Sequence, residues 1–226
     1  MIKVSIIIPV FNEINFIEEV LKKVNLKKKQ LNLQIIVSDD GSNDGTESFL
    51  KNNKNLFDNL VRSENNEGKG SAIKKALLYS DGDVIIIQDS DLEYDPNDYD
   101  KILQPFIFSN ADVVYGNRFG NNKFERVHYF SHRIANFALT TLVNFFTNIN
   151  FSDVECGFKA FKTSVLKNIS LFEKSFGFEI EVTKKISKLN LKIFQVPVSY
   201  NGRSYSEGKK IKFIDALRAL YCVVRY

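Results

Sequence analysis

The chain has 226 residues, 44% of them hydrophobic, which fits one large domain with a full core. Its 31 Lys and Arg against 27 Asp and Glu give a net charge of +4, which does not indicate nucleic-acid binding but fits an anionic substrate or membrane surface. Two cysteines, Cys156 and Cys222, exclude a disulfide framework and favour a reducing, cytosolic setting.

The first half of the chain alternates predicted strands and helices. Met1 leads directly into the first apolar run, so no secretory signal is expected. The β-branched runs predict strands at 4–10, 34–38, 60–62, 84–88 and 112–115. Periodic apolar residues predict helices at 14–24, 46–51, 72–77 and 97–106. This alternation predicts a mostly parallel sheet with right-handed crossovers, and therefore a Rossmann-like half that ends near Gly120.

Beyond Gly120 the alternation stops. We expect a long aromatic-rich helix, a strand with a turn, a second helix, a strand and a last amphipathic helix, at 129–146, 151–161, 178–189, 191–198 and 211–224. No internal repeat or low-complexity linker divides the chain. Both halves should therefore share one sheet in a single α/β domain, 1–226.

Two carboxylates one residue apart end the apolar run at 84–87. Side chains at i and i+2 of an extended chain point the same way, so Asp89 and Asp91 can face one point beyond the strand. Ligands of open α/β sheets bind at that end. Two hard oxygen ligands suit Mg2+ or Mn2+ and hence a substrate with phosphates, although a polar strand-end turn is the alternative.

Polar loops follow, or replace, four of the predicted strand ends on the same side. They lie at 9–13, 39–42, 65–70 and 89–91. Each alone has a structural explanation, such as a helix N-cap or a flexible loop. The loop at 65–70 is not a Walker loop, because the G-x-x-x-x-G-K spacing is missing. Together the four loops predict one binding site.

These segments resemble the family-2 glycosyltransferases of the GT-A fold. The matching residues are 4–13, Asp39-Asp40-Gly41-Ser42, Asn66 with Gly68-Lys69-Gly70, and Asp89-Ser90-Asp91. The second half is similar, more loosely, to the branch of dolichol-phosphate mannosyltransferases and other polyprenyl-phosphate hexosyltransferases. That likeness rests on Gly116-Asn117-Arg118, on Asp153 with Gly157-Phe158-Lys159, and on the segment from Arg203 to Lys209.

The resemblance implies a metal-dependent, inverting transfer of a hexose from a nucleoside-diphosphate sugar to a polyprenyl phosphate. Residues 1–120 would bind the donor and residues 121–226 the acceptor. Arg203 and Lys209 would close over the diphosphate as a mobile lid. The divalent cation would be held by Asp89, Asp91 and Glu93. The donor would be bound by Pro9, Phe11, Glu13, Asp39, Asp40, Asn66, Gly68 and Lys69.

The acceptor phosphate of this branch is already an anion and needs cations rather than a strong base. Arg118 fits that task, with Arg133 as a further candidate. His128 and His132, however, stand where the branch has Arg and Ser. An imidazole binds phosphate less strongly than a guanidinium.

A second departure leaves another acceptor open. Asp153-Val154-Glu155 has an added carboxylate where the branch has a small hydroxyl residue. If the acceptor were a hydroxyl of a lipid such as diacylglycerol, or of a glycan, a base would be needed, and Asp153 or Glu155 would supply it. A non-catalytic nucleotide-sugar-binding module is disfavoured, because the metal carboxylates and both loop cations are present.

The first and the last helix predicted in the second half, at 129–146 and 211–224, carry wide apolar faces. Such a face either packs against the core or lies on a membrane. The last helix also carries Lys and Arg, which suit anionic lipid. No apolar run approaches the roughly 20 residues of a spanning helix. We therefore expect a cytoplasmic protein with peripheral membrane contact, and a membrane-anchored partner or a homo-oligomer stays open.

Overall fold

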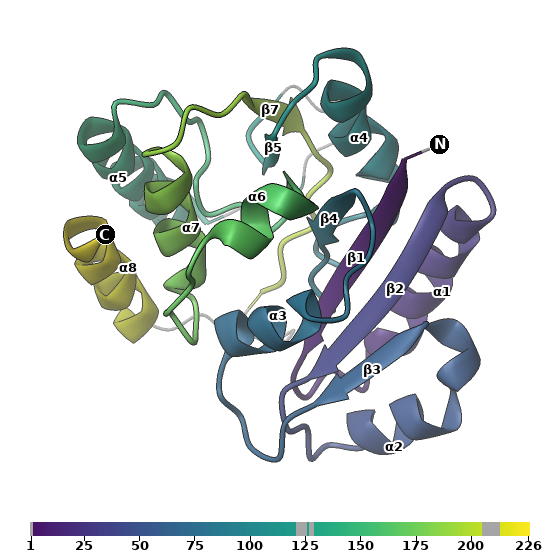
Figure 1. Cartoon of the computed structure of the whole chain (residues 1–226). Helices are drawn as coiled ribbons and strands as arrows, with labels where there is room; N and C mark the ends of the chain where they lie inside the picture. Colours follow the sequence, from purple (N-terminus) through teal and green to yellow (C-terminus); the bar gives the residue numbers. More distant parts are fainter. Residues whose placement is uncertain (1, 121–125, 127–128, 205–212) are drawn as a thin grey trace.

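The computed structural model of the chain describes residues 2–120, 126, 129–204 and 213–226. Seven strands form one sheet in the order β3-β2-β1-β4-β6-β5-β7 (Figure 1). The strands are β1 (Lys3–Val10), β2 (Asn32–Asp39), β3 (Asn59–Arg62), β4 (Val84–Ile87), β5 (Val113–Asn117), β6 (Lys159–Lys162) and β7 (Ile193–Pro197).

The sheet is mostly parallel and joins both halves of the chain. β3, β2, β1 and β4 run parallel to one another, as do β5 and β7. β6 lies between β4 and β5 and runs antiparallel to both. The predicted fold class, a single α/β domain around one shared sheet, is therefore confirmed.

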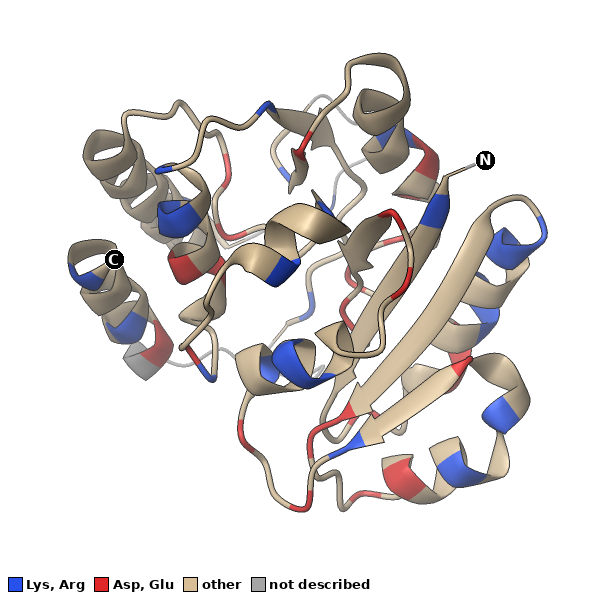
Figure 2. Ribbon diagram, viewed as in Figure 1, with Lys and Arg blue, Asp and Glu red and all other residues tan. Residues whose placement is uncertain are grey.

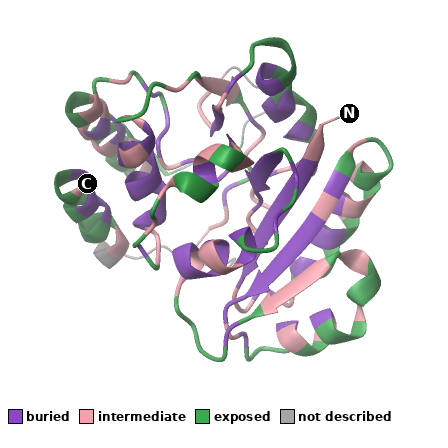
Figure 3. Ribbon diagram, in the orientation of Figure 1, coloured by how far each residue is buried: buried purple, intermediate pink, exposed green. Residues whose placement is uncertain are grey.

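Helices cover both faces of the sheet. They are α1 (Ile17–Lys28), α2 (Thr46–Asn52), α3 (Lys69–Leu77), α4 (Tyr99–Phe108), α5 (Phe130–Thr147), α6 (Thr163–Asn168), α7 (Phe178–Ile186) and α8 (Phe213–Arg225), with short 3-10 turns at Lys54–Leu56 and Pro96–Asp98. Alternate residues of β1 enter different cores: Ile6 and Ile8 pack with α1 and α4, and Ile7 packs with α3, α7 and α8. Figure 3 shows the central strands buried between these layers.

The segment predicted as a strand with a turn at 151–161 is strand only from Lys159, so that prediction was too long. The preceding residues turn back on themselves: the Lys159 ammonium is fully buried and donates to the carbonyl oxygens of Val154 (2.9 Å) and Cys156. A chain held in this way leaves the sheet and brings residues 153–157 to the carboxyl end of β4.

The aromatic face of α5 is largely exposed, so the interpretation as core packing was wrong for its phenylalanines. Phe130, Phe137 and Phe145 are 76%, 71% and 80% exposed, whereas Thr140 and Val143 are the buried residues of this helix. Arg133 is the one Lys, Arg, Asp or Glu along α5, whereas Lys, Arg, Asp and Glu are frequent on the helices around the first strands (Figure 2). Within the described ranges, no helix combines the length and the apolar character needed to cross a membrane.

Candidate active site

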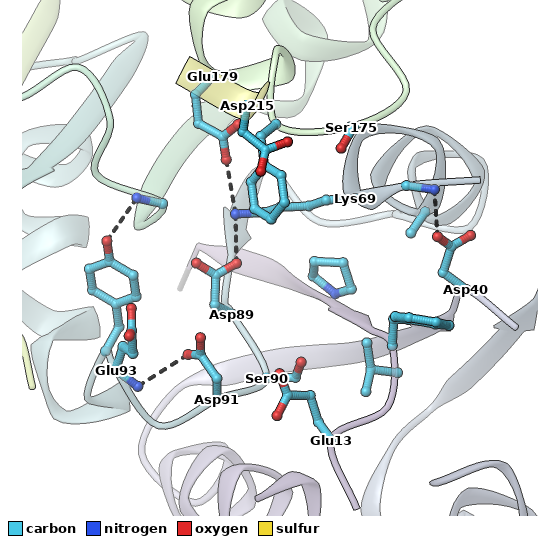
Figure 4. Close-up of a pocket in the computed structure, with 18 of the residues that line it drawn as sticks. Glu13, Asp40, Lys69, Asp89, Ser90, Asp91, Glu93, Ser175, Glu179 and Asp215 are labelled. Carbon is cyan, nitrogen blue, oxygen red and sulfur yellow. Dashed lines mark hydrogen bonds and ion pairs between the residues drawn. The ribbon is translucent and has the colours of Figure 1, made fainter. Parts of the chain in front are cut away.

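A cavity of about 660 Å³ lies beyond the carboxyl ends of β1, β2 and β4 (Figure 4). Most of the residues predicted from the sequence line it: Pro9, Phe11, Glu13, Asp40, Asn66, Gly68, Lys69, Asp89, Asp91, Glu93, Arg118, Glu155 and Arg203. Parallel strands deliver their following loops to one edge of a sheet, which explains why residues so far apart in sequence meet here. Lys209 and His128 lie outside the described residues.

Side-chain hydrogen bonds fasten the first two loops of the cavity to each other. The backbone of Asn12 adopts a positive φ of 51°, which turns the chain sharply after β1. Its N–H donates to Ser42 Oγ (2.9 Å), and its amide group exchanges hydrogen bonds with Asn43. The turn holds the buried Glu13 at the cavity wall.

Asp40 fastens the third loop. Its carboxylate accepts hydrogen bonds from the backbone N–H groups of Glu67 (3.1 Å) and Gly68 (2.6 Å). Gly68 has a φ of +100°, and a Cβ there would lie 2.4 Å from the carbonyl oxygen of Lys174. Glycine is therefore required at 68, and Lys69 begins α3 with its side chain in the cavity.

Arg203 reaches the carboxylates that follow β4. Its guanidinium donates to Asp91 (2.8 Å) and to Glu13 (3.2 and 3.3 Å), and its backbone N–H donates to Glu93 (2.8 Å). Burial, together with the nearby charges of Asp89 and Glu93, nevertheless raises the pKa of Asp91 to about 7. Negative charge thus exceeds the positive charge that Arg203 supplies.

Lys69 joins Asp89 to a residue that the sequence analysis missed, Glu179. The ammonium lies 2.7 Å from Asp89 Oδ1 and 2.9 Å from Glu179 Oε1 (Figure 4). Burial lowers the pKa of Lys69, but the two carboxylates more than reverse this and raise it, so the amine stays charged. Glu179 lies in the first turn of α7. An acidic residue at a helix start is common, so its sequence position alone did not mark it.

The carboxylates of this cavity have the chemistry of a Mg2+ or Mn2+ site. Asp89, Asp91 and Glu93 supply hard oxygen ligands, and the raised pKa of Asp91 reports an excess of negative charge that a divalent cation would neutralise. In the described part of the chain no three His, Cys, Asp or Glu side chains are close enough together to hold an ion. The carboxylates instead face Lys69 and Arg203, so metal binding requires an exchange of partners.

Two predicted site residues are not among those that line the cavity. Asp39 is buried, and its carboxylate accepts from Ser42 N (3.0 Å) and Arg62 Nε (3.2 Å). Asp153 is fully buried and forms a two-pronged ion pair with Arg118, at 2.7 and 2.8 Å. Both carboxylates thus hold neighbouring loops in place, and the pairing of Asp153 speaks against its use as a free base.

Glu155 is placed differently from Asp153. It lines the cavity, and its Oε1 is buried with no hydrogen-bond partner among the described residues. Burial, followed by the charge of Glu179, raises the pKa of Glu155 to about 7. A carboxylate with these properties can exchange a proton near neutral pH.

A second, cationic pocket of about 310 Å³ adjoins the first and shares Arg118, Tyr200 and Arg203 with it. Its further lining residues are Phe119, Arg126, Tyr129, His132, Arg133, Asn136, Gly202 and Ser204. His132 thus lies where the sequence placed it, at the start of α5, and Arg126 was not anticipated. Four arginines in one small pocket predict an anionic ligand.

Comparison with known proteins places the chain in a family. The family described as glycosyl transferase family 2 matches residues 5–170. An uncharacterised protein of Methanocaldococcus jannaschii is 36% identical, over 91% of this chain and 93% of its own length. The dolichol-phosphate mannosyltransferase of Pyrococcus furiosus is 27% identical, and the match covers 99% of this chain but 64% of that enzyme.

A solved structure has the same fold. Glucosyl-3-phosphoglycerate synthase from Mycobacterium tuberculosis, in complex with Mn2+, uridine diphosphate and phosphoglyceric acid, matches with a TM-score of 0.75 at 19% identity, over 99% of this chain and 78% of that one. Another structure of that enzyme holds Mg2+ and uridine diphosphate. The fold, the order of the cavity loops and the family match agree, and the chain belongs to glycosyl transferase family 2.

Proposed function

We propose that the protein transfers a hexose from a nucleoside-diphosphate sugar to a polyprenyl phosphate, with inversion and with Mg2+ or Mn2+. The observation that carries this proposal is the pair of adjoining pockets. One is lined by the carboxylates after β4, and the other by four arginines, and Arg118 and Arg203 belong to both. Two phosphate-bearing substrates would then meet where the pockets join.

On the donor side, the loops after β1 and β2 would bind the nucleoside and the residues after β4 the diphosphate. A divalent cation held by Asp89 and Asp91 would stabilise the negative charge that develops on the leaving diphosphate. Arg203 would turn from Asp91 toward the diphosphate, because a phosphate offers a guanidinium the same two-pronged contact as a carboxylate.

On the acceptor side, the arginines differ in how far their charge is already compensated. Arg118 is paired with Asp153, whereas Arg133 has no carboxylate partner among the described residues and packs over the Phe119 ring. Arg133 is therefore the residue whose charge is most available to an acceptor phosphate. Arg126 and Arg133 would compensate for the histidines that replace phosphate-binding residues of the polyprenyl-phosphate branch.

The exposed apolar faces support a lipid acceptor. Tyr129, His132 and Arg133 at the start of α5 line the arginine pocket, while Phe130 and Phe137 of the same helix are exposed. α8 packs beside α5 and exposes four further apolar residues, Leu217, Leu220, Tyr221 and Val224. We propose that this combined face lies on the cytoplasmic membrane surface, where it would present the arginine pocket to a lipid phosphate.

A hydroxyl acceptor is the second candidate, and Glu155 is the observation that favours it. A base is needed to remove a hydroxyl proton, and Glu155 has a pKa near neutral and an unpaired oxygen at the cavity. In that case the acceptor would be a lipid such as diacylglycerol, or a glycan.

The test is transfer by the purified protein from a panel of sugar nucleotides, with Mn2+ or Mg2+. One arm offers a short polyprenyl phosphate and the other diacylglycerol. Sugar on the polyprenyl phosphate, lost in Arg133→Ala but retained in the exposed control Arg225→Ala, supports the proposal. Sugar on diacylglycerol alone, lost in Glu155→Gln, would establish the second candidate instead.

A further inference from the structure

One oxygen of Glu179 is buried at the cavity without a partner. The residue is 5% exposed; its Oε1 contacts the Lys69 ammonium at 2.9 Å, and its Oε2 has no hydrogen-bond partner among the described residues. We infer that Glu179 binds hydroxyl groups of the transferred hexose and so determines which hexose is accepted. This inference rests on the proposed sugar-nucleotide donor, but it does not depend on the acceptor.

A buried, unsatisfied carboxylate oxygen is unfavourable unless a ligand completes it. Leaving such a group without a hydrogen bond destabilises the folded protein. Folding thus leaves Glu179, one of the residues that line the cavity, with one oxygen that accepts no hydrogen bond from the described residues.

Lys69 fixes where this free oxygen lies. Its single ammonium group contacts both Glu179 and Asp89, a predicted metal ligand. Glu179 is therefore held next to the position expected for the diphosphate, on the side of the cavity that α7 supplies. The hexose is joined directly to that diphosphate, so its ring must lie within reach of Glu179.

The chemistry of the free oxygen matches sugar hydroxyl groups. An ionised carboxylate only accepts hydrogen bonds, and a hexose presents several O–H donors. The Lys69 ammonium pairs with the other oxygen of Glu179 at 2.9 Å, and O–H bonds to a carboxylate are short and strong. A buried site that is built to bind one hydroxyl rejects sugars that lack it or point it elsewhere, because its oxygen would stay unpaired.

Binding of sugar nucleotides in the presence of Mn2+, without any acceptor, tests the inference. Calorimetry would compare a parent donor, its deoxy analogues and the nucleoside diphosphate alone, for the wild type and Glu179→Gln. We expect the variant to bind the parent donor roughly tenfold to a hundredfold more weakly. It should bind the nucleoside diphosphate as the wild type does.

The deoxy analogues give the sharper result. In the wild type, removal of one particular hydroxyl should weaken binding by a similar factor, and in Glu179→Gln the same removal should have little further effect. Glu18→Gln on α1, whose side chain is 55% exposed, is the matched control and should behave as the wild type. Thermal unfolding of each variant checks that the fold is retained.

Two results would overturn the inference. One is a set of deoxy penalties that is the same in the wild type and in Glu179→Gln. The other is unchanged donor binding with a turnover that falls equally for every donor, since this would make Glu179 a proton acceptor rather than a sugar ligand. If the wild type bound no sugar nucleotide, the proposed donor would be overturned as well. If the wild type bound the donor but did not transfer sugar to polyprenyl phosphate, only the proposed acceptor would be overturned.

Discussion

Arg203 donates a hydrogen bond of 2.8 Å to Asp91, although the two residues are 112 positions apart in the chain. The contact joins the segment after β7 to the carboxylates after β4. In the proposed mechanism Arg203 neutralises Asp91 in place of a divalent cation, and it would leave Asp91 when metal and donor bind. Metal affinity and donor affinity should therefore respond in opposite directions to changes at Arg203.

Asp91→Asn should lower turnover at least a hundredfold, because it removes a charged ligand for the divalent cation. Its thermal unfolding midpoint at pH 8 should not fall, since the pKa of about 7 shows that the negative charge of Asp91 is unfavourable there. Transfer assays measure the turnover, and differential scanning calorimetry measures the unfolding midpoint. Near-normal turnover of this variant with the metal chelated would contradict the mechanism.

Arg203→Ala should bind Mn2+ roughly tenfold more tightly in the absence of donor, because Asp91, Glu13 and Glu93 lose their cation. The same variant should bind the nucleoside diphosphate more weakly. Electron paramagnetic resonance counts free Mn2+ during a titration and needs no turnover. Arg62→Ala, which also removes an arginine from two carboxylates, is the control; unchanged Mn2+ affinity in Arg203→Ala would refute the exchange.

Glu155→Gln should change how stability depends on pH. The pKa of Glu155 is about 7 in the folded protein and 4.5 in the unfolded chain, so the folded state binds the extra proton between these values. Wild-type stability is therefore lost as pH rises from about 4.5 to 7, and the variant should be more stable by about 3 kcal/mol at pH 8 and equal at pH 4. Urea unfolding at both pH values measures the free energy of unfolding. The same difference between variant and wild type at pH 4 and at pH 8 would disprove the prediction.

Phe145→Ser should weaken binding to anionic vesicles roughly tenfold, because a buried phenyl ring contributes about 1.5–3 kcal/mol. Phe108→Ser is a matched control: both side chains are 80% exposed, but Phe108 ends α4, which packs with the opposite core. Vesicle sedimentation measures the difference. Equal losses in the two variants would show that general hydrophobicity, and not this face, binds the membrane.

The sheet and the cavity loops could be predicted because their signals are local. Asp89 and Asp91 follow a buried strand directly, and parallel strands bring such endings together whatever the helices between them contain. The antiparallel direction of β6 could not be predicted, because the pattern of its four residues does not distinguish the two strand directions.

The pairing of side chains from different loops of the cavity could not be predicted from the sequence either. Asp153 forms an ion pair with Arg118 and Glu155 does not, although both carboxylates lie about equally far from Arg118 in the sequence; Asp153 and Arg118 are 35 positions apart. Glu179 became a candidate only when its contact with Lys69 was known. The face of α5 was undecidable for another reason: an apolar stripe with helical period looks the same whether a core or a membrane covers it.

The place of β6 in the sheet has a consequence for how the protein is made. β4, which leads into Asp89, has its outer edge paired by residues that are synthesised some 75 positions later. A ribosome-bound or truncated chain that stops near residue 120 would leave that edge of apolar residues open to other chains. We expect such fragments to aggregate, so the two halves should not recombine into a folded protein when they are expressed apart.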